Sequence, residues 1–394
     1  TFFQAKYKRH TNFAMENIEQ TVNGTAANSG RVSVTVARNG DLVGDMYIQL
    51  ESDEATTVTT EAADCNWVAE RAINNVELSI GGQRIDKHYQ KWWRMYSELY
   101  LDESKKASWG KMTTAGDGKT VYLPLIFFFN RNPGLYLPLI ALQYHEVRLD
   151  FDLASNFTTY LNAGVFKVWA NYVYLDTEER RRFAQKGHEY LIEQVQHTGT
   201  DTVTSAGTKQ VRLSYNHPVK ELVWCFSNTQ TNNGMWNFTT ASTDLNIKLD
   251  SNQSALEGSN CFISTAQTGT PMVKVGAIGG SSIFTEEAVG PLSTFKLILN
   301  GQDRFKEQAG KYFNQVQPFN HHTGCPYPGI YSYSFALKPE EHQPTGTCNF
   351  SRIDNAQVQV VANTLNNATS LHMFATNYNV LRIQSGMGGL AFSN

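Results

Sequence analysis

The sequence predicts an all-β fold made of two similar domains, and three observations support this prediction. Short segments of alternating apolar and polar residues recur along the whole chain, helical patterns are few, and one order of motifs occurs twice. The chain has 394 residues, enough for two domains of about 200 each. Aromatic residues make up 12% and charged residues only 18%, against a usual charged fraction of about 25%. This composition is typical of a β-rich body with extensive buried or subunit-facing surface.

The predicted strands have apolar side chains at every second position. The first runs over residues 31–37, and an Asn39-Gly40 turn connects it to a second strand over residues 42–50. The further strands are predicted at 76–80, 165–174, 211–215, 221–226, 295–299, 331–337 and 358–361. A chain of many short strands separated by turn residues favours a β-sandwich architecture over a helical one.

Helical patterns appear at two places. Residues 87–100 carry Trp92, Trp93, Tyr96 and Leu99 at helical spacing. A second, charged helix is predicted near 177–186, with Asp176 as its N-cap residue and acidic residues in the first turn. A polar stretch follows, and we place the domain boundary there: a first domain over residues 1–196, ending in this linker helix, and a second over 197–394.

The two halves follow one plan. Residues 76–83 resemble residues 295–302, an offset of 301 − 82 = 219, and each of these strands ends in a Gly-Gln pair. In each half there follow a charged segment with aromatic residues, an aromatic strand (126–129 and 331–335), a loop with two prolines and a late alternating strand. Two tandem all-β domains, each with about eight strands and long loops, predict a double jelly roll with a few short helices.

The loop after the apolar run at 122–129 is the most informative segment of the first half. Proline residues within it exclude a regular helix, so we expect a tight, apolar surface loop that leads into a returning strand at 147. It contains no nucleophile, metal-ligand set or phosphate-binding pattern. We therefore predict that it packs between domains or between subunits, through Arg131, Pro133, Leu135, Tyr136, Leu137 and Pro138.

Catalytic and metal-binding patterns are weak. His145-Glu146 begins a predicted strand, where a structural hydrogen bond is favoured over acid–base chemistry. His321 and His322 could hold a metal together with Cys325 only if a loop turned both rings the same way, because adjacent strand residues point in opposite directions. We predict no catalytic residue, no cofactor and no metal site, and hence a protein that is not an enzyme.

Other features exclude further classes of protein or leave them open. Asp150 and Asp152 share a strand face, which resembles a glycosidase pair only superficially, so solvated or hydrogen-bonded carboxylates are favoured. The net charge of −3 gives no basic face for nucleic acid. The five cysteines are far apart, which argues against disulfides or a zinc site and favours small buried side chains. Candidate glycan acceptors in polar, loop-like stretches are Asn156, Asn237 and Asn252.

Several motifs, in order along the whole chain, resemble one family of viral proteins. They are TFF at 1–3 with YKRHTNFAME at 7–16, NRNPG at 130–134 with LPLIALQYHE at 137–146, DTEERRRFA at 176–184, NHPVKELVW at 216–224, SFALKP at 334–339 with PTGTCNFSR at 344–352, and NYNVLR at 377–382 with GMGGLA at 386–391. Together they resemble the major capsid proteins of the nucleocytoplasmic large double-stranded DNA viruses, most of all the algal-virus members.

The resemblance implies a double jelly roll that forms a pseudo-hexagonal homotrimer, because each subunit supplies two similar domains. Such trimers tile an icosahedral shell over an internal membrane. The implied partners are other copies of the chain, neighbouring capsomers, minor capsid proteins and, indirectly, the inner virion membrane, without sequence-specific binding of nucleic acid. The implied location is the virion capsid, assembled in the host cytoplasm. In this family a short arm precedes the TFF motif.

Three alternatives stay open at this point. A carbohydrate-binding jelly roll would present exposed aromatic platforms, for which the candidates are Trp67, Trp92, Trp93 and Trp236. A glycoside hydrolase would need two carboxylates about 5 to 9.5 Å apart in a cleft. A minor or penton capsid protein would share the fold and differ in copy number.

Overall fold

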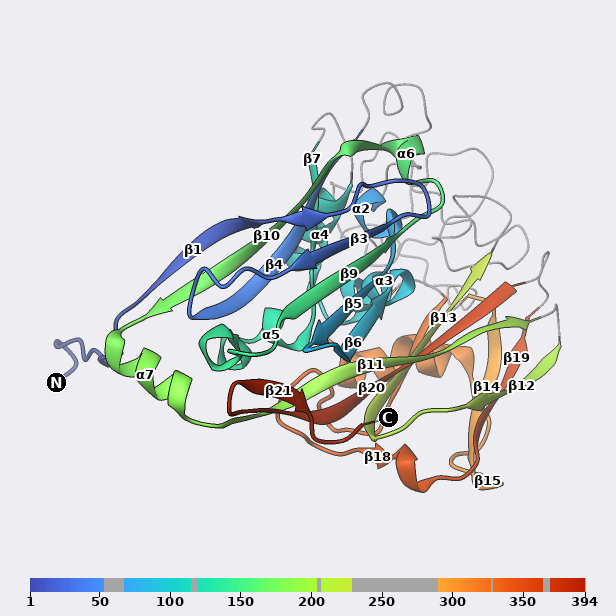
Figure 1. Ribbon diagram of the computed structural model, residues 1–394. Coiled ribbons are helices and arrows are strands. Elements are labelled where there is room, and N and C mark those ends of the chain that lie inside the picture. Colours follow the sequence, from blue (N-terminus) through green and yellow to red (C-terminus); the bar gives the residue numbers. More distant parts are fainter. Residues whose placement is uncertain are drawn as a thin grey trace.

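Four antiparallel sheets form the body of the protein (Figure 1). The computed structural model describes residues 1–52, 67–114, 120–203, 207–228, 290–326, 329–363 and 369–393. Two of the sheets are built from residues before the helix α7 (Thr177–Gln185), and the other two from residues after it. In Figure 1 the blue-to-green half and the yellow-to-red half are therefore separate layered units, joined at α7.

The first half contains two sheets that pack face to face. Sheet 1A has the strand order β1 (Phe13–Gln20), β10 (Leu161–Leu175), β4 (Leu42–Ser52) and β7 (Thr120–Pro124), with β8 (Leu137–Pro138) also paired to β4. Sheet 1B has the order β2 (Val22–Asn23), β3 (Arg31–Thr35), β9 (Val147–Leu153), β5 (Ile73–Ile80) and β6 (Gln83–Tyr89). The alternating residues of the two sheets meet in one apolar core.

The second half repeats this arrangement. Sheet 2A has the order β11 (His188–Val203), β20 (Thr369–Gln384), β13 (Pro218–Asn228) and β17 (Ile330–Ser334), with β18 (Cys348–Asn349) on β13 and β21 (Met387–Leu390) on β20. Sheet 2B has the order β12 (Thr208–Leu213), β19 (Ala356–Ala362), β14 (Leu292–Leu299) and β15 (Gln302–Asp303), with β16 (Gln308–Ala309) on β14. Eight strands in each half occupy corresponding places: β1-β10-β4-β7 and β3-β9-β5-β6 in the first match β11-β20-β13-β17 and β12-β19-β14-β15 in the second. This is the double jelly roll predicted from the sequence.

The correspondence extends to individual residues. Val43 of β4 pairs with β8, and Val219 of β13 pairs with β18, an offset of 219 − 43 = 176. Next to these residues, the pairing of β4 with β10 and the pairing of β13 with β20 each shift register, the first between Ala170 and Tyr172 and the second between Val219 and Glu221. The two sheets therefore carry the same bulge at the same place.

The Gly-Gln repeat read from the sequence is a pair of equivalent hairpins. Ile80 pairs with Gln83 across Gly81-Gly82, and Leu299 pairs with Gln302 across Asn300-Gly301. All four turn residues have positive φ, between 51° and 83°. Two-residue turns of this kind require glycine or asparagine, which explains the repeat in the sequence.

Helices are short and lie in the connections between strands. In the described ranges they are, besides α7, the helices α2 (Val68–Arg71), α3 (Gln90–Leu99), α4 (Glu103–Thr113), α5 (Phe128–Arg131), α6 (Phe157–Tyr160) and α9 (Gln317–His321), the π-helical turn η5 (Tyr312–Val316), and the 3₁₀ turns η2 (Pro133–Leu135), η3 (Leu139–Ala141) and η6 (Phe350–Arg352). The predicted linker helix is α7, capped by the Asp176 carboxylate, which accepts a hydrogen bond from the Thr177 N–H. Among the described residues, no helix has the length and apolar character needed to span a membrane.

Two local expectations were wrong, the strand at 126–129 and the start of the helix at residue 87. Residues 126–129 are not a strand, because the Asn130 side chain closes a helical turn: it accepts from the Phe127 N–H at 3.2 Å and donates to the Gly44 carbonyl at 2.8 Å. The strands on either side of Asn39-Gly40 lie in different sheets, β3 in sheet 1B and β4 in sheet 1A. The helix expected from residue 87 begins at Gln90, because β6 extends to Tyr89.

Candidate assembly surface

The predicted packing loop lies between β7 and β9 and begins with α5. Of its six predicted residues, Arg131 and Pro133 are on the outside, Tyr136 is half-buried, and Leu135, Leu137 and Pro138 are buried. The ring of Tyr136 covers Gly44 so closely that a Cβ atom there would lie 2.5 Å from Cζ of the ring. The expectation of a surface loop is thus wrong for the leucines, which belong to the core of the first jelly roll.

An equivalent loop joins β17 to β19 in the second jelly roll. In both, a two-residue strand pairs with the equivalent position of a strand in its own sheet, β8 with β4 and β18 with β13, and a 3₁₀ turn follows directly. The second of the two proline-containing loops expected from the sequence, near residues 339–352, therefore occupies the corresponding connection. The two loops differ in their contacts, since the first loop buries leucines and the second carries Glu340, which reaches another part of the molecule.

The two jelly rolls meet where sheet 2A packs against α3. Side chains on one face of sheet 2A, such as Trp224, belong to the core of the second jelly roll. Side chains on the opposite face belong to the core of the first: Ile192, Val223, Cys225, Ile330, Phe374, Leu381 and Ile383. Trp92 of α3 lies 6.1 Å from Phe374, measured between ring centroids. Sheet 2A is thus covered by protein on both faces.

Arg131 connects the predicted packing loop to the second jelly roll. Its guanidinium donates to Oε2 of Glu193 on β11 at 3.0 Å, and Lys220 Nζ lies 2.7 Å from Oε1 of the same carboxylate. Burial alone would raise the pKa of Glu193, but Lys220 and Arg131 outweigh burial and hold this pKa below its ordinary value. Arg131 is therefore a contact between the two domains, and the charge that it meets is almost fully buried.

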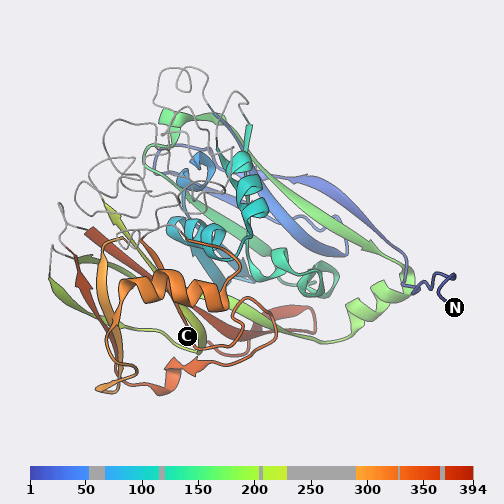
Figure 2. The same ribbon diagram turned by 180° about the vertical axis from the view of Figure 1, so that it is seen from behind.

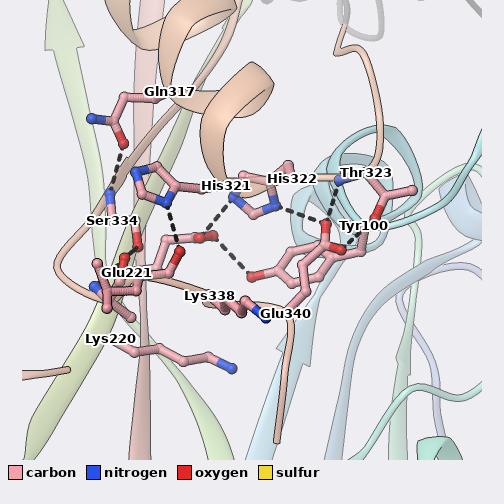
Figure 3. A network of polar contacts seen from close by, with 12 residues as sticks. Tyr100, Lys220, Glu221, Gln317, His321, His322, Thr323, Ser334, Lys338 and Glu340 are labelled. Atoms are coloured by element: carbon pink, nitrogen blue, oxygen red, sulfur yellow. Dashed lines mark hydrogen bonds and ion pairs between the residues drawn. The ribbon is translucent and has the colours of Figure 1, made fainter. Parts of the chain in front are cut away.

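A second buried polar network involves four residues from distant parts of the chain (Figure 3). Tyr100, at the end of α3, donates to Oε1 of Glu221 at 2.9 Å. His322, which follows α9, lies between two carboxylates: Nε2 is 2.7 Å from Glu221 Oε2, and Nδ1 is 3.1 Å from Glu340 Oε1. Glu340 also accepts from the Thr323 N–H at 2.8 Å. This network holds the segment after α9 against the first jelly roll.

The imidazole of His322 is fully buried, and its charge state follows from its neighbours. Burial alone would lower the pKa of His322, but Glu221 and Glu340 outweigh it and raise the pKa to about 9. The pKa of Glu340 lies below its ordinary value, since the hydrogen bonds from His322 and Thr323 outweigh burial. At neutral pH the network therefore contains an imidazolium between carboxylates, which is the paired arrangement that a buried charge requires.

Backbone contacts extend the same junction. The Gly324 N–H donates to the Leu99 carbonyl at 2.9 Å, and Lys106 Nζ of α4 donates to the Cys325 carbonyl at 2.5 Å. A Cβ atom at Gly324 would lie 2.2 Å from the Glu98 carbonyl oxygen, so only glycine allows this close approach. The segment 322–325 is consequently fitted closely onto α3 and α4.

The histidine candidates have structural partners. His145 Nδ1 lies 3.0 Å from the Gly388 carbonyl oxygen and 3.1 Å from the Gly388 nitrogen, in the hairpin of β20 and β21. His321 Nδ1 lies 3.1 Å from the Leu337 carbonyl oxygen, away from the partners of His322. Within the described ranges, no group of three or more His, Cys, Asp or Glu side chains is placed to hold a metal ion.

The remaining predicted residues are distributed over the molecule. Asp150 accepts from Ser33 and Arg148 at 2.7 and 3.0 Å, so this carboxylate is engaged in sheet 1B. Asn156 is exposed before α6, whereas Asn237 and Asn252 lie outside the described residues. Of the cysteines, Cys225 is buried, Cys348 is half-buried and Cys325 is exposed; Cys65 and Cys261 lie outside the described residues.

The aromatic platforms that a carbohydrate-binding module needs are not formed by three of the four predicted tryptophans. Trp67, Trp92 and Trp93 are all buried, with at most 2% of each residue exposed. Trp236 lies outside the described residues. The tryptophans expected on a binding surface instead fill the core beside α3.

The sequence interpretation missed the buried charges between the jelly rolls. Glu193, Lys220 and Glu221 lie on strands, and His322 was weighed only as a metal ligand. One signal was available: Lys220-Glu221 interrupts an otherwise apolar strand, and charged residues in a buried strand need partners. Their partners, however, are 27 or more positions away in sequence and emerge only from the fold.

Two protein-family models together match almost the whole chain. "Major capsid protein N-terminus" matches residues 1–176, and "Large eukaryotic DNA virus major capsid protein" matches residues 179–389. The major capsid protein of Paramecium bursaria Chlorella virus 1 is 42% identical over 100% of this chain and 94% of its own length. That of Phaeocystis pouchetii virus is 38% identical over 100% of this chain and 95% of its own length.

Solved structures agree with the relatives. The quasi-atomic model of the PBCV-1 virus capsid superposes with a TM-score of 0.80 at 39% identity, over 100% of both chains. The Faustovirus major capsid protein superposes with a TM-score of 0.70 at 11% identity, over 98% of this chain and 93% of its own, a likeness of fold alone. The chain belongs to the major capsid proteins of the large eukaryotic DNA viruses.

Proposed function

We propose that this major capsid protein forms pseudo-hexagonal homotrimeric capsomers that tile an icosahedral shell. The observation that carries the proposal is the matching order of eight strands in the two jelly rolls, together with the shared bulge beside Val43 and Val219. Three copies of such a chain supply six similar units, so a three-fold ring acquires a nearly six-fold outline. The strong coupling of the two units within one chain supports the proposal, because a rigid pair is needed to keep that outline.

The test is the mass and symmetry of the purified protein. Mass photometry is expected to give a particle of three chains, and negative-stain class averages are expected to have a hexagonal outline. A particle of one chain at all concentrations would contradict the proposal. A trimer whose averages lack six similar lobes would contradict the pseudo-hexagonal part of it.

The chain's role is structural, with shape and contact surface in place of catalysis. Its partners are other copies of itself, neighbouring capsomers and minor capsid proteins, with the inner virion membrane as an indirect neighbour, and assembly takes place in the host cytoplasm. The exposed Asn156 is a glycan acceptor, which intact-mass measurement of protein from virions would test by a mass difference that disappears in Asn156→Gln.

The division of the chain falls at α7, earlier than the boundary expected at residue 196. β11 runs unbroken from His188 to Val203 and pairs with β20 along its length, so a boundary at 196 would cut a continuous strand. The packing loop then acts at the junction of the two units, with Arg131 as its contact to the second jelly roll. Limited proteolysis is expected to cleave near α7 before it cleaves within β11.

A further inference from the structure

Within the part of the chain that the structure describes, one face of sheet 1A has no partner, although the equivalent face of sheet 2A is covered by the first jelly roll. The offset of 176 relates Tyr47 to Val223, since 47 + 176 = 223, and both residues point away from the core of their own jelly roll. On the adjacent strand, Trp169 of β10 lies opposite Tyr47, and Phe374 of β20 lies opposite Val223. Val223 and Phe374 are buried by the first jelly roll, whereas Tyr47 and Trp169 are only half-buried.

The uncovered face has the composition of an interface. Tyr47 and Tyr122 stack edge to face at 5.7 Å between ring centroids, and Trp169 Nε1 donates to Gln49 Oε1 at 2.8 Å. Exposed apolar side chains continue the face along β1, where Met15 is 52% and Phe13 is 61% exposed. Tyrosine and tryptophan residues that combine apolar area with hydrogen-bonding groups are enriched at protein interfaces.

A second uncovered patch lies on the helical segment η5–α9. In the first jelly roll, β6 is followed by α3, and in the second jelly roll the corresponding strand β15 is followed by η5–α9. Whereas α3 is buried by sheet 2A, η5–α9 buries only the face with Phe313 and Gln317. On its other face Val316 is 42% exposed and Phe319 is 87% exposed. Leu337, which is 76% exposed, lies beside this segment, because its carbonyl oxygen contacts Nδ1 of His321.

The two patches lie on different sides of the molecule. Strands β1 and β4 are in front in Figure 1, and the orange helical segment is in front in Figure 2, after a half turn. One copy of the chain therefore cannot bring its own η5–α9 onto its own sheet 1A. Two different patches that match each other but cannot meet within one chain form a heterologous contact, which closes into a ring when the rotation permits.

We infer that the helical segment η5–α9 of one copy docks on the outer face of sheet 1A of the next copy, as α3 docks on sheet 2A within the chain. The contact unites Val316, Phe319 and Leu337 with Tyr47, Trp169 and their neighbours. Around the ring, a helical segment then docks on the outer face of a sheet at every junction. This contact occurs alternately within one chain and between neighbouring chains. The inference rests on the proposed capsomer and adds which surfaces hold it together.

Cysteine cross-linking tests the pairing of the two surfaces directly. In a Cys325→Ser background, the double variant Gln49→Cys with Phe319→Cys is treated with a short bismaleimide. The expected products are covalent dimers and trimers, and each single variant is expected to give none, because a heterologous contact never places a residue against its own copy. Cross-linking by either single variant would overturn the inference in favour of a symmetric contact.

A charge on the exposed patch gives an independent measurement. Phe319→Asp is expected to raise the dissociation constant of the capsomer by about a hundredfold, as for a central aromatic contact. Phe2→Asp is the matched control, since Phe2 is fully exposed on the N-terminal segment, and its dissociation constant is expected to be unchanged. Unchanged circular dichroism would confirm that the Phe319 variant is folded, as its exposure predicts.

The outcomes separate this inference from the capsomer itself. A trimer that persists in Phe319→Asp, and gives no cross-links in the double variant, would overturn the assignment of surfaces and leave the capsomer in place. A wild-type protein that is monomeric by mass photometry would overturn both. The pairing of η5–α9 with sheet 1A is supported if Phe319→Asp loses the trimer and if cross-links form in the double cysteine variant but in neither single variant.

Discussion

Sheets 1A and 2A have the same strand order and the same bulge, yet their outer faces differ in chemistry. Sheet 2A presents Val223, Cys225 and Phe374, all buried against the first jelly roll. The equivalent positions of sheet 1A are Tyr47, Gln49 and Trp169, which stay half-buried in the single chain. A face that is covered as the chain folds can be purely apolar. A face that is covered only on assembly is exposed to water before then, and therefore combines apolar area with polar groups. The comparison thus distinguishes folding contacts from assembly contacts.

The largest expected effect contrasts two equivalent aromatic residues. Phe374→Ala is expected to lower the free energy of unfolding by about 3–5 kcal/mol, because it leaves a cavity between the jelly rolls. Trp169→Ala is expected to lower it by only about 1 kcal/mol, as for a partly exposed side chain. Urea unfolding in the Phe319→Asp background, which should be monomeric, measures both. Equal losses in the two variants would contradict the distinction between covered and uncovered faces.

The next effect is on the pH dependence of the covered interface. The pKa of His322 in the folded protein, about 9, lies above the unfolded value of 6.5. Its protonation therefore contributes stability that is fully present below pH 6.5 and is lost as the pH rises through 9, at most about 3 kcal/mol. Scanning fluorimetry from pH 6 to 10 should give a steeper fall of Tm in the wild type than in His322→Gln.

The comparison of the wild type with His322→Gln is necessary because Lys91 also changes its charge in this pH range. Burial lowers the pKa of Lys91 to about 8, below its ordinary 10.5, so its contribution has the opposite sign and stability rises as the pH rises above 8. The wild type and His322→Gln share this lysine, and only the difference between their curves reports the histidine. Parallel curves would show that the His322 charge does not stabilise the junction.

A smaller effect tests whether the predicted packing loop is held by its own domain. Gly44→Ala is expected to lower the free energy of unfolding by about 1–3 kcal/mol, since its Cβ would meet the Tyr136 ring. Removing the ring in Tyr136→Ala should relieve that clash, so the double variant should lose less than the sum of the two single variants. Strict additivity of the two losses would contradict the close contact between loop and strand.

The smallest effect concerns the contact of Arg131 with the second jelly roll. Arg131→Met is expected to lower the free energy of unfolding by about 1 kcal/mol, because Glu193 keeps Lys220 as a partner. Arg382→Met is the matched control: it removes an exposed ion pair with Glu189 on the same strand β11, and should change stability by less than about 0.5 kcal/mol. A larger loss in the control would remove the case for Arg131 as a domain contact.

The sequence allowed the fold to be predicted because its signals are local. Alternating strands, the two Gly-Gln turns and the Asp176-capped helix each depend on residues within a few positions of one another. The placement of β3 and β4 in different sheets could not be predicted, since alternation indicates which face of a strand is buried and not which strand lies beside it. Nor could the His322 network, whose members come from positions 100, 221, 322 and 340.

A cryo-electron microscopy reconstruction of the purified capsomer tests directly whether η5–α9 of one chain docks on sheet 1A of the next. We expect three chains, six jelly rolls around one axis, and the segment η5–α9 of each chain seated on sheet 1A of its neighbour, with Phe319 beside Trp169. A map in which three chains meet through other surfaces, with Phe319 and Trp169 both facing solvent, would contradict this expectation.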